Sequence, residues 1–550
     1  MCHALCAMAE QYGLPNAHMY AMAVAPTGCA AVVAGGNTCH SIAGLPTKAW
    51  HDAQREPAAA LLARIQNAFK STWLLFNDEK SMMGLQMLGA FDCRAAQALQ
   101  GRRSMYPFDP YCDGRFDGGA SLTEISNGFR RFASYVLIGD LGQLPPVMDT
   151  KWWKTTHSAM GLRGDRLIQS IDVSWSLLGS VRQKGDSTYA DLLWRAHEGE
   201  FVEDDWRVLR ERVETQLPPA ERDSFSDAMR LYQTKALARA ANLSCMARGF
   251  GVRFPRVAHV PATHNVAAAA SFSDDHAAGL QRTAWHVVGA PHMITSNLWT
   301  RAGLTNGLTG ELVDLICEQS PWETCLLVAL LAVDVDKLPR GSGFTCADEA
   351  LAVRLFGRKL CDGFRERTQG GRRHVCPGFE TCPRGVEAHA PRRVLVPVPP
   401  ITREWRDRRG REMTRTMLPL RLAVAITMHK SQGMTIPCVA ANLGDTEMHL
   451  GGTFTVLSRV PALTGLALER GLNFDRLAKI NQSRSLLARK EYEAAKWPPL
   501  EANALRHFQS ILAELLLRRG SPEAAVLDTI GGLAETAAEQ LSLPDFTAEL

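Results

Sequence analysis

The chain has 550 residues, of which 46% are hydrophobic and 21% are charged. This composition excludes a wholly disordered, collagenous or coiled-coil protein, and at roughly 100–200 residues per domain we expect three or four domains. The net charge is +4, from 61 basic and 57 acidic residues, so any nucleic-acid binding would depend on a local groove rather than on the charge of the whole chain.

The 14 cysteines show no disulfide-scaffold pattern, so we expect mostly reduced thiols in an intracellular protein. The longest apolar run, Cys325 to Val333, is about half as long as a bilayer span, which predicts no transmembrane helix and no membrane partner. Residues 1–13 lack the basic region of a secretory signal and have the apolar spacing of a helix.

Short apolar runs separated by helical patterns predict the strands of one parallel sheet. These runs are residues 19–25, 73–77 and 135–139. Polar residues follow the strands: Thr27, the pair Asp78-Glu79, and Asp140. The carboxyl ends of parallel strands line the ligand crevice of such a sheet, so we expect these side chains at one edge.

Composition and pattern divide the rest of the chain. Residues 101–130 are rich in Gly, Asp and Arg and predict an inserted loop, whereas 186–250 is mainly helical. Two short strands flank a Gly-rich turn within 284–316, and residues 340–412 predict an irregular insertion or a small β module. The expected boundaries are a first domain at 1–180, the start of a second at 181–330, an inserted module at 331–412, the end of the second domain at 413–475 and a helical extension at 476–550.

The segment LLFNDEKSM at 74–82 carries the strongest local signal for chemistry. A buried strand that runs into adjacent carboxylates is the Walker B arrangement. In it, Asp78 would hold Mg²⁺ through water and Glu79 would accept a proton from the attacking water. An ordinary exposed Asp-Glu pair after a strand explains this segment equally well.

Two further segments follow predicted strands of the same sheet. In GDLGQLPPV at 139–147, the amide of Gln143 could sense a γ-phosphate and orient water; the alternative is a turn with a chance Gln. In APTGCAAVVAGGNTCHSIAGLP at 25–46, small residues allow close backbone approach to a ligand. Thr27, Thr38 and His40 could hydrogen-bond phosphates there, although the pattern alone is weak.

Two segments near the end of the second domain complete the set. AITMHKSQGMTI at 425–436 places hydrogen-bond donors beside Gly433, a cluster that suits a phosphodiester backbone. These donors are Thr427, His429, Lys430 and Ser431. FTVLSRV at 454–460 predicts a strand that presents Arg459, either as an arginine finger on a transferring phosphate or in a surface salt bridge.

In this order, the five segments resemble motifs Ia, II, III, V and VI of the Pif-type DNA helicases (named for petite integration frequency). This family belongs to helicase superfamily one and includes the helicases carried by Helitron transposons. LGSVRQKGD at 178–186 is similar to motif IV, with Arg182 at the phosphate-sensing position. NLWTRAGLTNGLTGELVDL at 297–315 is similar to the family's hairpin, and the resemblance covers roughly residues 19–470.

The resemblance implies an α/β fold with two RecA-like domains of the P-loop NTPase type and a small irregular or β insertion in the second. ATP and Mg²⁺ would bind between the domains. The protein would move 5′ to 3′ along single-stranded DNA and unwind duplex DNA. Such helicases work in DNA repair, recombination, telomere maintenance or transposition, and we expect a monomer in the nucleus or in the mitochondrion.

The resemblance also implies roles for individual residues. The ATP site would contain Asp78, Glu79 and Gln143 from the first domain, and Arg182, Gly433 and Arg459 from the second. The DNA-binding residues would be Thr27, His40, Thr427, His429, Lys430 and Ser431.

The chain departs from the family at its phosphate-binding loop, since it contains no G-x-x-x-x-G-K-[ST] motif. Residues 1–13 resemble the helix that follows this loop. Either the gene model starts at an internal Met, or the chain is a catalytically inactive remnant that binds single-stranded nucleic acid without ATP turnover. A third alternative is an ATPase domain broken from a larger Helitron protein. Asn77 also replaces an apolar residue, and Lys80 would pair with Glu79 and lower its pKa.

Two features lie outside these motifs. A zinc site is one interpretation of the cluster His374, Cys376, Cys382 and His389. Its Cys-x5-Cys spacing is longer than the usual zinc-finger spacing, so reduced loop residues are the alternative. Trp405 in TREWRDRRG would either stack on a base or lie in a solvated β-hairpin.

Overall fold

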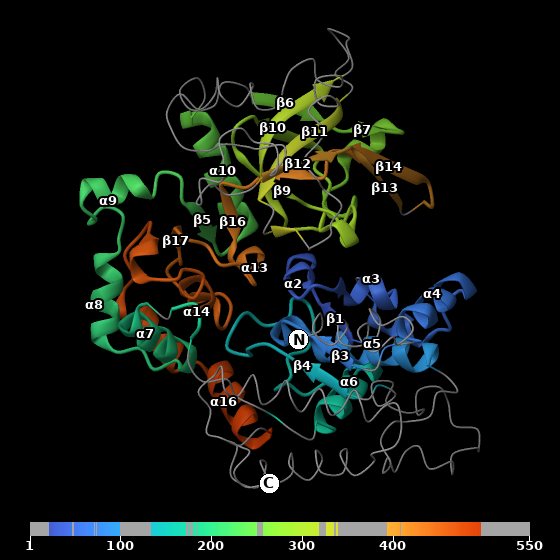
Figure 1. Ribbon diagram of the computed structural model, residues 1–550, viewed down its shortest axis with the longest axis horizontal. Coiled ribbons are helices and arrows are strands. Elements are labelled where there is room, and N and C mark those ends of the chain that lie inside the picture. The colour runs from blue at the N-terminus through green and yellow to red at the C-terminus, as the bar shows by residue number, and fades with distance from the viewer. Residues whose placement is uncertain are drawn as a thin grey trace, which may run out of the picture.

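The computed structural model describes residues 21–46, 49–70, 72, 74–99, 132, 134–171, 174, 180–183, 185–249, 257–317, 326–334, 337–338, 393–407 and 409–496. In these residues the chain forms two domains built on parallel sheets, and a β module at the top of Figure 1. No helix in these ranges is both long and apolar enough to cross a membrane.

The first domain contains a four-stranded parallel sheet in the order β2-β1-β3-β4. Its strands are β1 (Ala21–Ala25), β2 (Asn37–Thr38), β3 (Leu74–Asn77) and β4 (Ser134–Leu137). Its helices are α2 (Gly28–Val33), α3 (Cys39–Ala43), α4 (Ala59–Phe69), α5 (Leu85–Ala98) and α6 (Ala159–Gln169). Phe69 packs edge to face on both Phe91 and Phe132 in the core. The predicted parallel sheet is thus confirmed over the described residues.

The second domain contains a four-stranded parallel sheet in the order β16-β5-β17-β18. Its strands are β5 (Met229–Tyr232), β16 (Ala425–Thr427), β17 (Val439–Asn442) and β18 (Leu466–Leu468). The helices are α7 (Ser187–Glu198), α8 (Glu203–Glu211), α9 (Pro219–Ser224), α10 (Lys235–Gly249), α13 (Met428–Ser431), α14 (Gly452–Leu457), α15 (Phe474–Asn481) and α16 (Arg484–Lys496). Strands β5 and β16 are neighbours in this sheet although 192 residues lie between them, so the intervening chain is an insertion.

The insertion is a β module with antiparallel pairing. Its strands are β6 (Val257–Pro261), β7 (Thr263–His264), β8 (Thr283–Val287), β9 (Pro291–Ile294), β10 (Thr309–Cys317), β11 (Leu326–Asp334), β12 (Arg393–Val398), β13 (Ile401–Arg406), β14 (Glu412–Met417) and β15 (Leu420–Leu422). The predicted boundary at residue 331 is therefore wrong, because it falls inside β11. Pairing between β9 and β15, far apart in sequence, joins the two halves of the module.

Arg415 on β14 organises one end of this module. Its side chain is fully buried and donates to the carbonyls of Leu280 and Phe272 at 2.9 and 2.8 Å, and to Asp274 at 3.2 Å. Trp405 lies in the β13–β14 hairpin, 5.8 Å from this guanidinium, and its ring contacts Phe272. The β-hairpin interpretation of Trp405 is thus confirmed, with its ring packed against the module.

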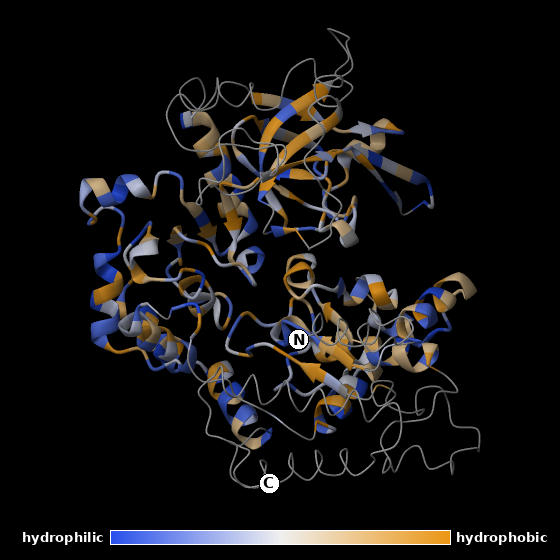
Figure 2. Cartoon of the chain, viewed as in Figure 1, coloured by the Kyte–Doolittle hydropathy of each residue, from blue (hydrophilic) through white to orange (hydrophobic). Residues whose placement is uncertain are grey.

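Figure 2 shows mainly hydrophobic residues in the first sheet and in the long strands of the β module, and hydrophilic stretches on α8 and α16. Short 3₁₀ helices are η2 (Trp50–Gln54), η3 (Lys80–Met82), η5 (Ala267–Ser271), η6 (Thr300–Ala302) and η8 (Leu463–Gly465). Of the predicted C-terminal extension at 476–550, the described residues 476–496 form α16 and most of α15, which begins two residues before the predicted boundary. Predictions for residues 1–13, 101–130, 374–389 and 497–550 lie outside the described residues.

Two buried histidines make the β module sensitive to acid. His286 on β8 is fully buried, and neither ring nitrogen has a hydrogen-bond partner among the described residues. Its ring lies 5.5 Å from that of buried His292. Burial lowers the pKa of His286 to about 3 and that of His292 to about 4, from 6.5. Protonation of either ring therefore opposes folding, so the free energy of unfolding is unaffected by it above pH 6.5 and decreases progressively as the pH falls toward 4.

We predict that His286→Leu weakens this pH dependence. Between pH 6.5 and 4, each histidine should lower the wild-type free energy of unfolding by about 1.4 kcal/mol per pH unit. The variant lacks the contribution of His286, so its free energy of unfolding should fall only by the contribution of His292. Amide hydrogen exchange of the β module at several pH values measures this difference. Identical pH dependence in both proteins would show that His286 is not buried in its neutral form.

Candidate nucleotide and nucleic-acid site

Asp78 and Glu79 follow the last residue of β3, at the carboxyl edge of the first sheet. The N–H of Asp78 still donates to the carbonyl of Val24 on β1, at 2.9 Å. Glu79 then turns the chain with a φ of 55°, which is uncommon for a residue other than glycine. Burial raises the pKa of both carboxyl groups, although both residues remain partly exposed. Carboxylate oxygens in this setting suit a hydrated divalent cation.

Glu79 is held by a residue of the second domain, Gln432. The Nε2 of Gln432 donates to Oε2 of Glu79 and to Oγ of Ser81, each at 3.0 Å. The next residue, Gly433, has a φ of 80°, and a Cβ there would lie 3.4 Å from Oε1 of Glu79. Gly433 thus lies beside the predicted catalytic carboxylate. Sequence reasoning missed Gln432, although it lies within HKSQG, because the donors of that segment were assigned to DNA.

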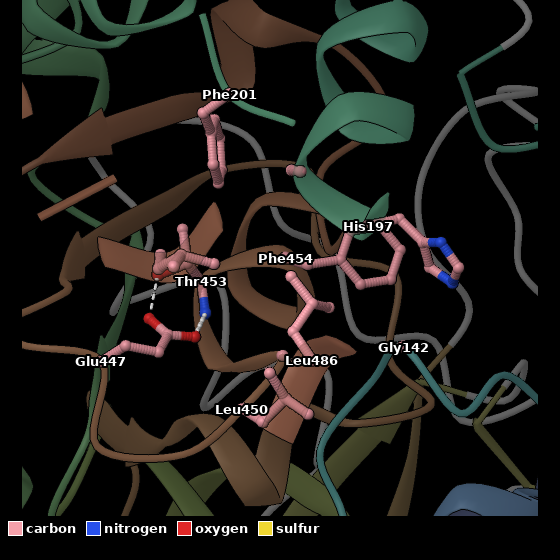
Figure 3. A pocket seen from close by; sticks show the side chains of 11 residues that line it. Gly142, His197, Phe201, Glu447, Leu450, Thr453, Phe454 and Leu486 are labelled. Atoms are coloured by element: carbon pink, nitrogen blue, oxygen red, sulfur yellow. Dashed lines mark hydrogen bonds between the residues drawn. The ribbon is translucent and has the colours of Figure 1, made fainter. Parts of the chain in front are cut away.

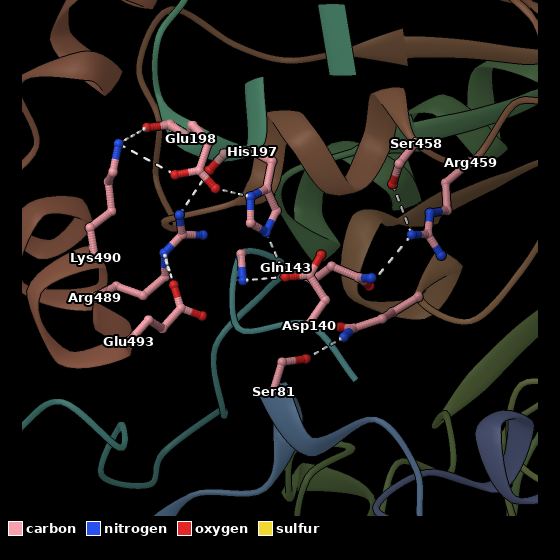
Figure 4. A network of polar contacts seen from close by, with 12 residues as sticks. Ser81, Asp140, Gln143, His197, Glu198, Ser458, Arg459, Arg489, Lys490 and Glu493 are labelled. Carbon is pink, nitrogen blue, oxygen red and sulfur yellow. Dashed lines mark hydrogen bonds and ion pairs between the residues drawn. The ribbon is translucent and has the colours of Figure 1, made fainter. Parts of the chain in front are cut away.

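Arg459 approaches the same carboxylate edge from the second domain. Only 1% of its surface is exposed. Its Nη2 lies 3.4 Å from Oε1 of Gln143 (Figure 4). Its Nε donates to the carbonyl of Thr455 at 2.8 Å. Among the described residues it forms no ion pair, so the surface salt-bridge interpretation is wrong. Burial and the nearby Arg182 lower the pKa of Arg459 to about 10, which still leaves it protonated at neutral pH.

Arg182 lies beside Arg459, just before α7. Its Nη1 donates to the carbonyl of Ser458 at 2.6 Å, and its Nε donates to Oγ1 of Thr435 at 2.9 Å. Burial lowers the pKa of Arg182, and the charge of Glu79 opposes this effect. The structure therefore brings together the predicted ATP-site residues of both domains. They are Asp78, Glu79, Gln143, Arg182, Gly433 and Arg459.

Helix α14 ends at Leu457, two residues before Arg459, so the predicted strand over 454–460 is wrong. Gly451 begins the helix with a φ of 76°. Glu447 accepts from the backbone N–H of Thr453 at 2.9 Å and also from its hydroxyl, as Figure 3 shows. This side-chain cap satisfies the first turn and outweighs the strand preference of the β-branched residues.

Asn77 and Lys80, the two residues next to the carboxylate pair that differ from the family pattern, have contacts that the sequence did not predict. The expected lower pKa of Glu79 beside Lys80 is wrong in direction, because burial raises it and Gln432 is the partner that opposes the rise. Lys80 is attracted instead by Glu493 and Asp140. Asn77 is buried, and its side-chain Oδ1 accepts from the thiol of Cys39 at 3.7 Å.

The predicted DNA-binding residues of the first domain lie at helix starts. Thr27 caps α2 by accepting from the N–H of Ala30, and Thr38 caps α3 by accepting from that of Ser41, at 3.3 and 3.1 Å. His40 lies in α3 with its ring 5.7 Å from that of Trp50. Burial lowers the pKa of His40, so its ring is neutral at pH 7.

The hairpin within 297–306 joins this edge to the second domain. Nζ of exposed Lys430 donates to Oδ1 of Asn306 at 2.7 Å, and the Cys29 thiol lies 3.6 Å from the Asn306 carbonyl. A Cβ on Gly28 would lie 2.7 Å from Cβ of Thr305, so only a glycine allows the hairpin this close. Segments from both domains and the β module thus form one surface.

The side chains of residues 427–431 differ in how accessible they are to DNA. Thr427 and His429 are partly exposed, and burial lowers the pKa of His429 to about 4. The side chain of Ser431 is fully buried and donates to the carbonyl of Met428 at 2.8 Å. The prediction that Ser431 contacts DNA is therefore wrong for this arrangement, since its hydroxyl is inaccessible and already bonded.

No family model matches the chain. The ATP-dependent DNA helicase PIF1 of Danio rerio is 28% identical over 472 residues, which are 85% of this chain and 56% of that protein. The ATP-dependent DNA helicase Pif1 of Psychrobacter sp. is 42% identical over 86 residues, 14% of this chain and 13% of that protein. The chain thus spans about half the length of the Danio rerio relative, and less of the other.

Solved structures of Pif1 helicases have the same fold. The enzyme from Candida albicans superposes with a TM-score of 0.54 at 19% identity, over 90% of this chain and 92% of that one. The enzyme from Bacteroides in complex with ADP-AlF3 and ssDNA gives 0.54 at 18% identity, over 87% of this chain and 88% of that one. The chain is therefore related in sequence to the Pif1 helicases and has their α/β fold of two RecA-like domains.

Proposed function

We propose that the chain is an ATP-dependent DNA helicase that moves 5′ to 3′ along single-stranded DNA and unwinds duplex DNA. One observation carries this proposal: the carboxylate pair at the edge of the first sheet faces two arginines of the second domain, and Glu79 lies close enough to attract both. The names of the related proteins, ATP-dependent DNA helicases, support the same reaction. The structure of the Bacteroides relative with ADP-AlF3 and ssDNA supports both ligands.

The buried guanidinium of Arg459 is the best indication that a polyanion binds here. Its partners among the described residues are an amide, a hydroxyl and backbone carbonyls, and none of them carries a charge. Glu79 and Asp140 attract it, but neither accepts a hydrogen bond from it. A buried cation without a hydrogen-bonded anion is costly, and the γ-phosphate of ATP would compensate it. Arg182 lies close enough to share this role.

The carboxylates opposite fit the other half of the reaction. We propose that Asp78 holds Mg²⁺ through water, and the ion would neutralise charge that develops on the phosphate oxygens. Glu79 would accept the proton of the attacking water, and its raised pKa brings it closer to that task. Gln143 would orient this water, with Arg459 on its other side.

ATP hydrolysis would be coupled to domain movement because the residues of the ATP site come from both domains. Because the γ-phosphate would contact Arg182 and Arg459 of one domain, and Asp78 of the other would hold its Mg²⁺ through water, binding should draw the domains together and hydrolysis should release them. We propose that single-stranded DNA lies on the surface formed by Thr27, His40, Thr427, His429 and Lys430. The histidines would act there as neutral hydrogen-bond donors, since burial lowers both pKa values.

The biological setting is a proposal that rests on the relatives alone. DNA repair, recombination, telomere maintenance and transposition all need such an activity. We propose a nuclear or mitochondrial protein that acts as a monomer. Its ATP-site residues support this state, because a single chain supplies them from both domains.

A second candidate is a protein that binds single-stranded DNA without ATP turnover. It is favoured by one observation, that the printed sequence contains no G-x-x-x-x-G-K-[ST] motif to surround the β-phosphate. Unwinding assays separate the candidates. A helicase should displace a strand from a duplex with a 5′ tail and not from one with a 3′ tail, only with ATP. DNA binding with no displacement would support the second candidate.

We predict that Arg459→Lys lowers ATP turnover by a factor on the order of 10³, because lysine lacks the planar fork that reaches two phosphate oxygens. Affinity for single-stranded DNA should change little. The matched control is Arg470→Lys, since Arg470 forms an exposed pair with Asp445 at 3.6 Å. Equal turnover in both variants would exclude Arg459 from the reaction.

We also predict that Lys430→Gln weakens binding to oligo-dT and lowers the salt dependence by about 0.7 in the slope of log K against log salt, as the loss of one phosphate contact requires. Lys479→Gln is the control, because Lys479 is an exposed lysine on α15. Fluorescence anisotropy at several salt concentrations measures both. Equal slopes for Lys430→Gln and the wild type would place DNA elsewhere.

A further inference from the structure

The loop that carries Gln143, residues 139–147, bridges the two domains: Leu141 is buried in the core of the first domain, whereas the part of the loop around Leu144 packs in the second. Leu144 is fully buried among second-domain residues. A Cβ on Gly451, the residue that begins α14, would lie 2.2 Å from the carbonyl oxygen of Gly142. The loop is thus pressed against the start of the helix that leads to Arg459.

His197, near the end of α7, makes the polar contact that holds this loop. Its Nε2 donates to Oδ1 of Asp140 at 2.7 Å, and its Nδ1 donates to Oε1 of Glu198 at 2.6 Å (Figure 4). Carboxylates only accept hydrogen bonds, so both ring nitrogens must carry protons for both bonds to form. The geometry therefore requires the charged imidazolium, and Asp140 also accepts from the N–H of Gly142 at 2.7 Å.

Helix α16 supports this contact from the other side. Arg489 is fully buried, and its Nη2 donates to the carbonyl of His197 at 2.9 Å. Leu486 packs over Gly199, just after α7, whereas Tyr492 packs against the core of the first domain. The helix therefore contacts both domains at the place where the loop crosses between them.

Gly142 shows how tightly these parts fit. A Cβ at this position would lie 2.2 Å from Nε2 of His197 and 2.5 Å from Nη1 of Arg489. Any side chain would push the loop away from both residues. In Figure 3 the loop at Gly142 passes beside Leu450, Phe454 and Leu486, side chains that line the same small pocket.

The charges around His197 favour its protonated form. Those that act on it or on its carboxylate partners are Asp140 on the loop, Glu198 on α7, Arg489, Lys490 and Glu493 on α16, and Lys80 beside Asp140. Burial by itself would lower the pKa of His197, but the hydrogen bonds to Asp140 and Glu198 outweigh it and raise the pKa to about 9. Burial would raise the pKa of Asp140, and the bond from His197 keeps it low.

We propose that His197 is a positioning residue that ties the 139–147 loop to the second domain by its charge, and so keeps Gln143 beside Arg459. The effect of this tie on ATP turnover rests on the proposed function. The tie itself is a property of the chain alone, because it joins two domains without any ligand.

The test measures the distance between the domains in the absence of nucleotide and DNA, so it is independent of any activity. Dyes on unnatural amino acids at exposed Gln66 on α4 and exposed Asp223 on α9 report this distance by energy transfer. His197→Gln should lose the high-transfer population at pH 7.5, whereas His197→Arg should retain it. His51→Gln, the same change at an exposed histidine, should resemble the wild type.

The pH dependence of the interdomain distance shows whether the charge of His197 or only the shape of its side chain holds the loop. A raised pKa means that the tie is complete well below pH 9 and is lost as the pH rises through about 9. The wild type should therefore open over this range, and His197→Arg should not. An unchanged distance in His197→Gln, or the same pH response in wild type and His197→Arg, would overturn the proposal.

A second pair of variants tests the tie without touching a charge. Gly142→Ala should also lose the high-transfer population, because its Cβ would meet His197 and Arg489. Gly471→Ala is the control, since its Cβ would meet only an ordinary contact with Val213 at 3.7 Å. Equal distances in both glycine variants would contradict the proposed packing.

If the chain hydrolyses ATP, His197→Gln should lower kcat about tenfold with little change in KM, and His197→Arg should restore it.

Discussion

The loop of residues 139–147 leaves the first sheet after β4 and is fixed by the second domain. Leu144 anchors it by burial, Asp140 by an ion pair with His197, and Gln143 by its contact with Arg459. Together with the bonds from Gln432 to Glu79 and Ser81, these three contacts set how far apart the domains lie, and therefore where the carboxylates of the first sheet face the arginines of the second domain. The site is an interface, and its geometry depends on this loop.

The charges at that interface are unevenly compensated. Asp140 pairs with His197, and Glu79 accepts from the amide of Gln432, whereas buried Arg459 donates its hydrogen bonds only to neutral groups among the described residues. Burial of a guanidinium without an anion weakens the folded state unless an anion binds. A nucleotide triphosphate would supply that anion, and its hydrolysis would remove part of it. This imbalance gives a physical reason for domain motion to follow the nucleotide.

The strands and their terminal residues could be predicted because both signals are local. A buried apolar run fixes a strand, and its carboxyl end places Asp78, Glu79 and the loop with Gln143 at one edge. The motif resemblance then placed Arg182 and Arg459 in the same site. The strand predicted over 454–460 failed because a cap from Glu447 decides the local structure there. Ser431 was misplaced because its burial follows from packing that the sequence does not reveal.

The features that the sequence did not predict depend on contacts between residues far apart in the chain. The β module begins near residue 257 rather than 331, because β9 pairs with β15 more than a hundred residues away. Gln432 reaches Glu79, and Arg489 reaches His197, across 353 and 292 residues of sequence. No pattern within a short window carries such information. The distance between domains is therefore the part of the account that only a folded structure could supply.

The central claim is that carboxylates and arginines of two domains form one ATP site governed by DNA. ATP hydrolysis by the purified 550-residue chain, with and without single-stranded DNA at fixed salt, tests this claim most directly. The account predicts turnover that rises when DNA is added. DNA binding with no turnover under any condition would contradict it and leave a helicase fold without its reaction.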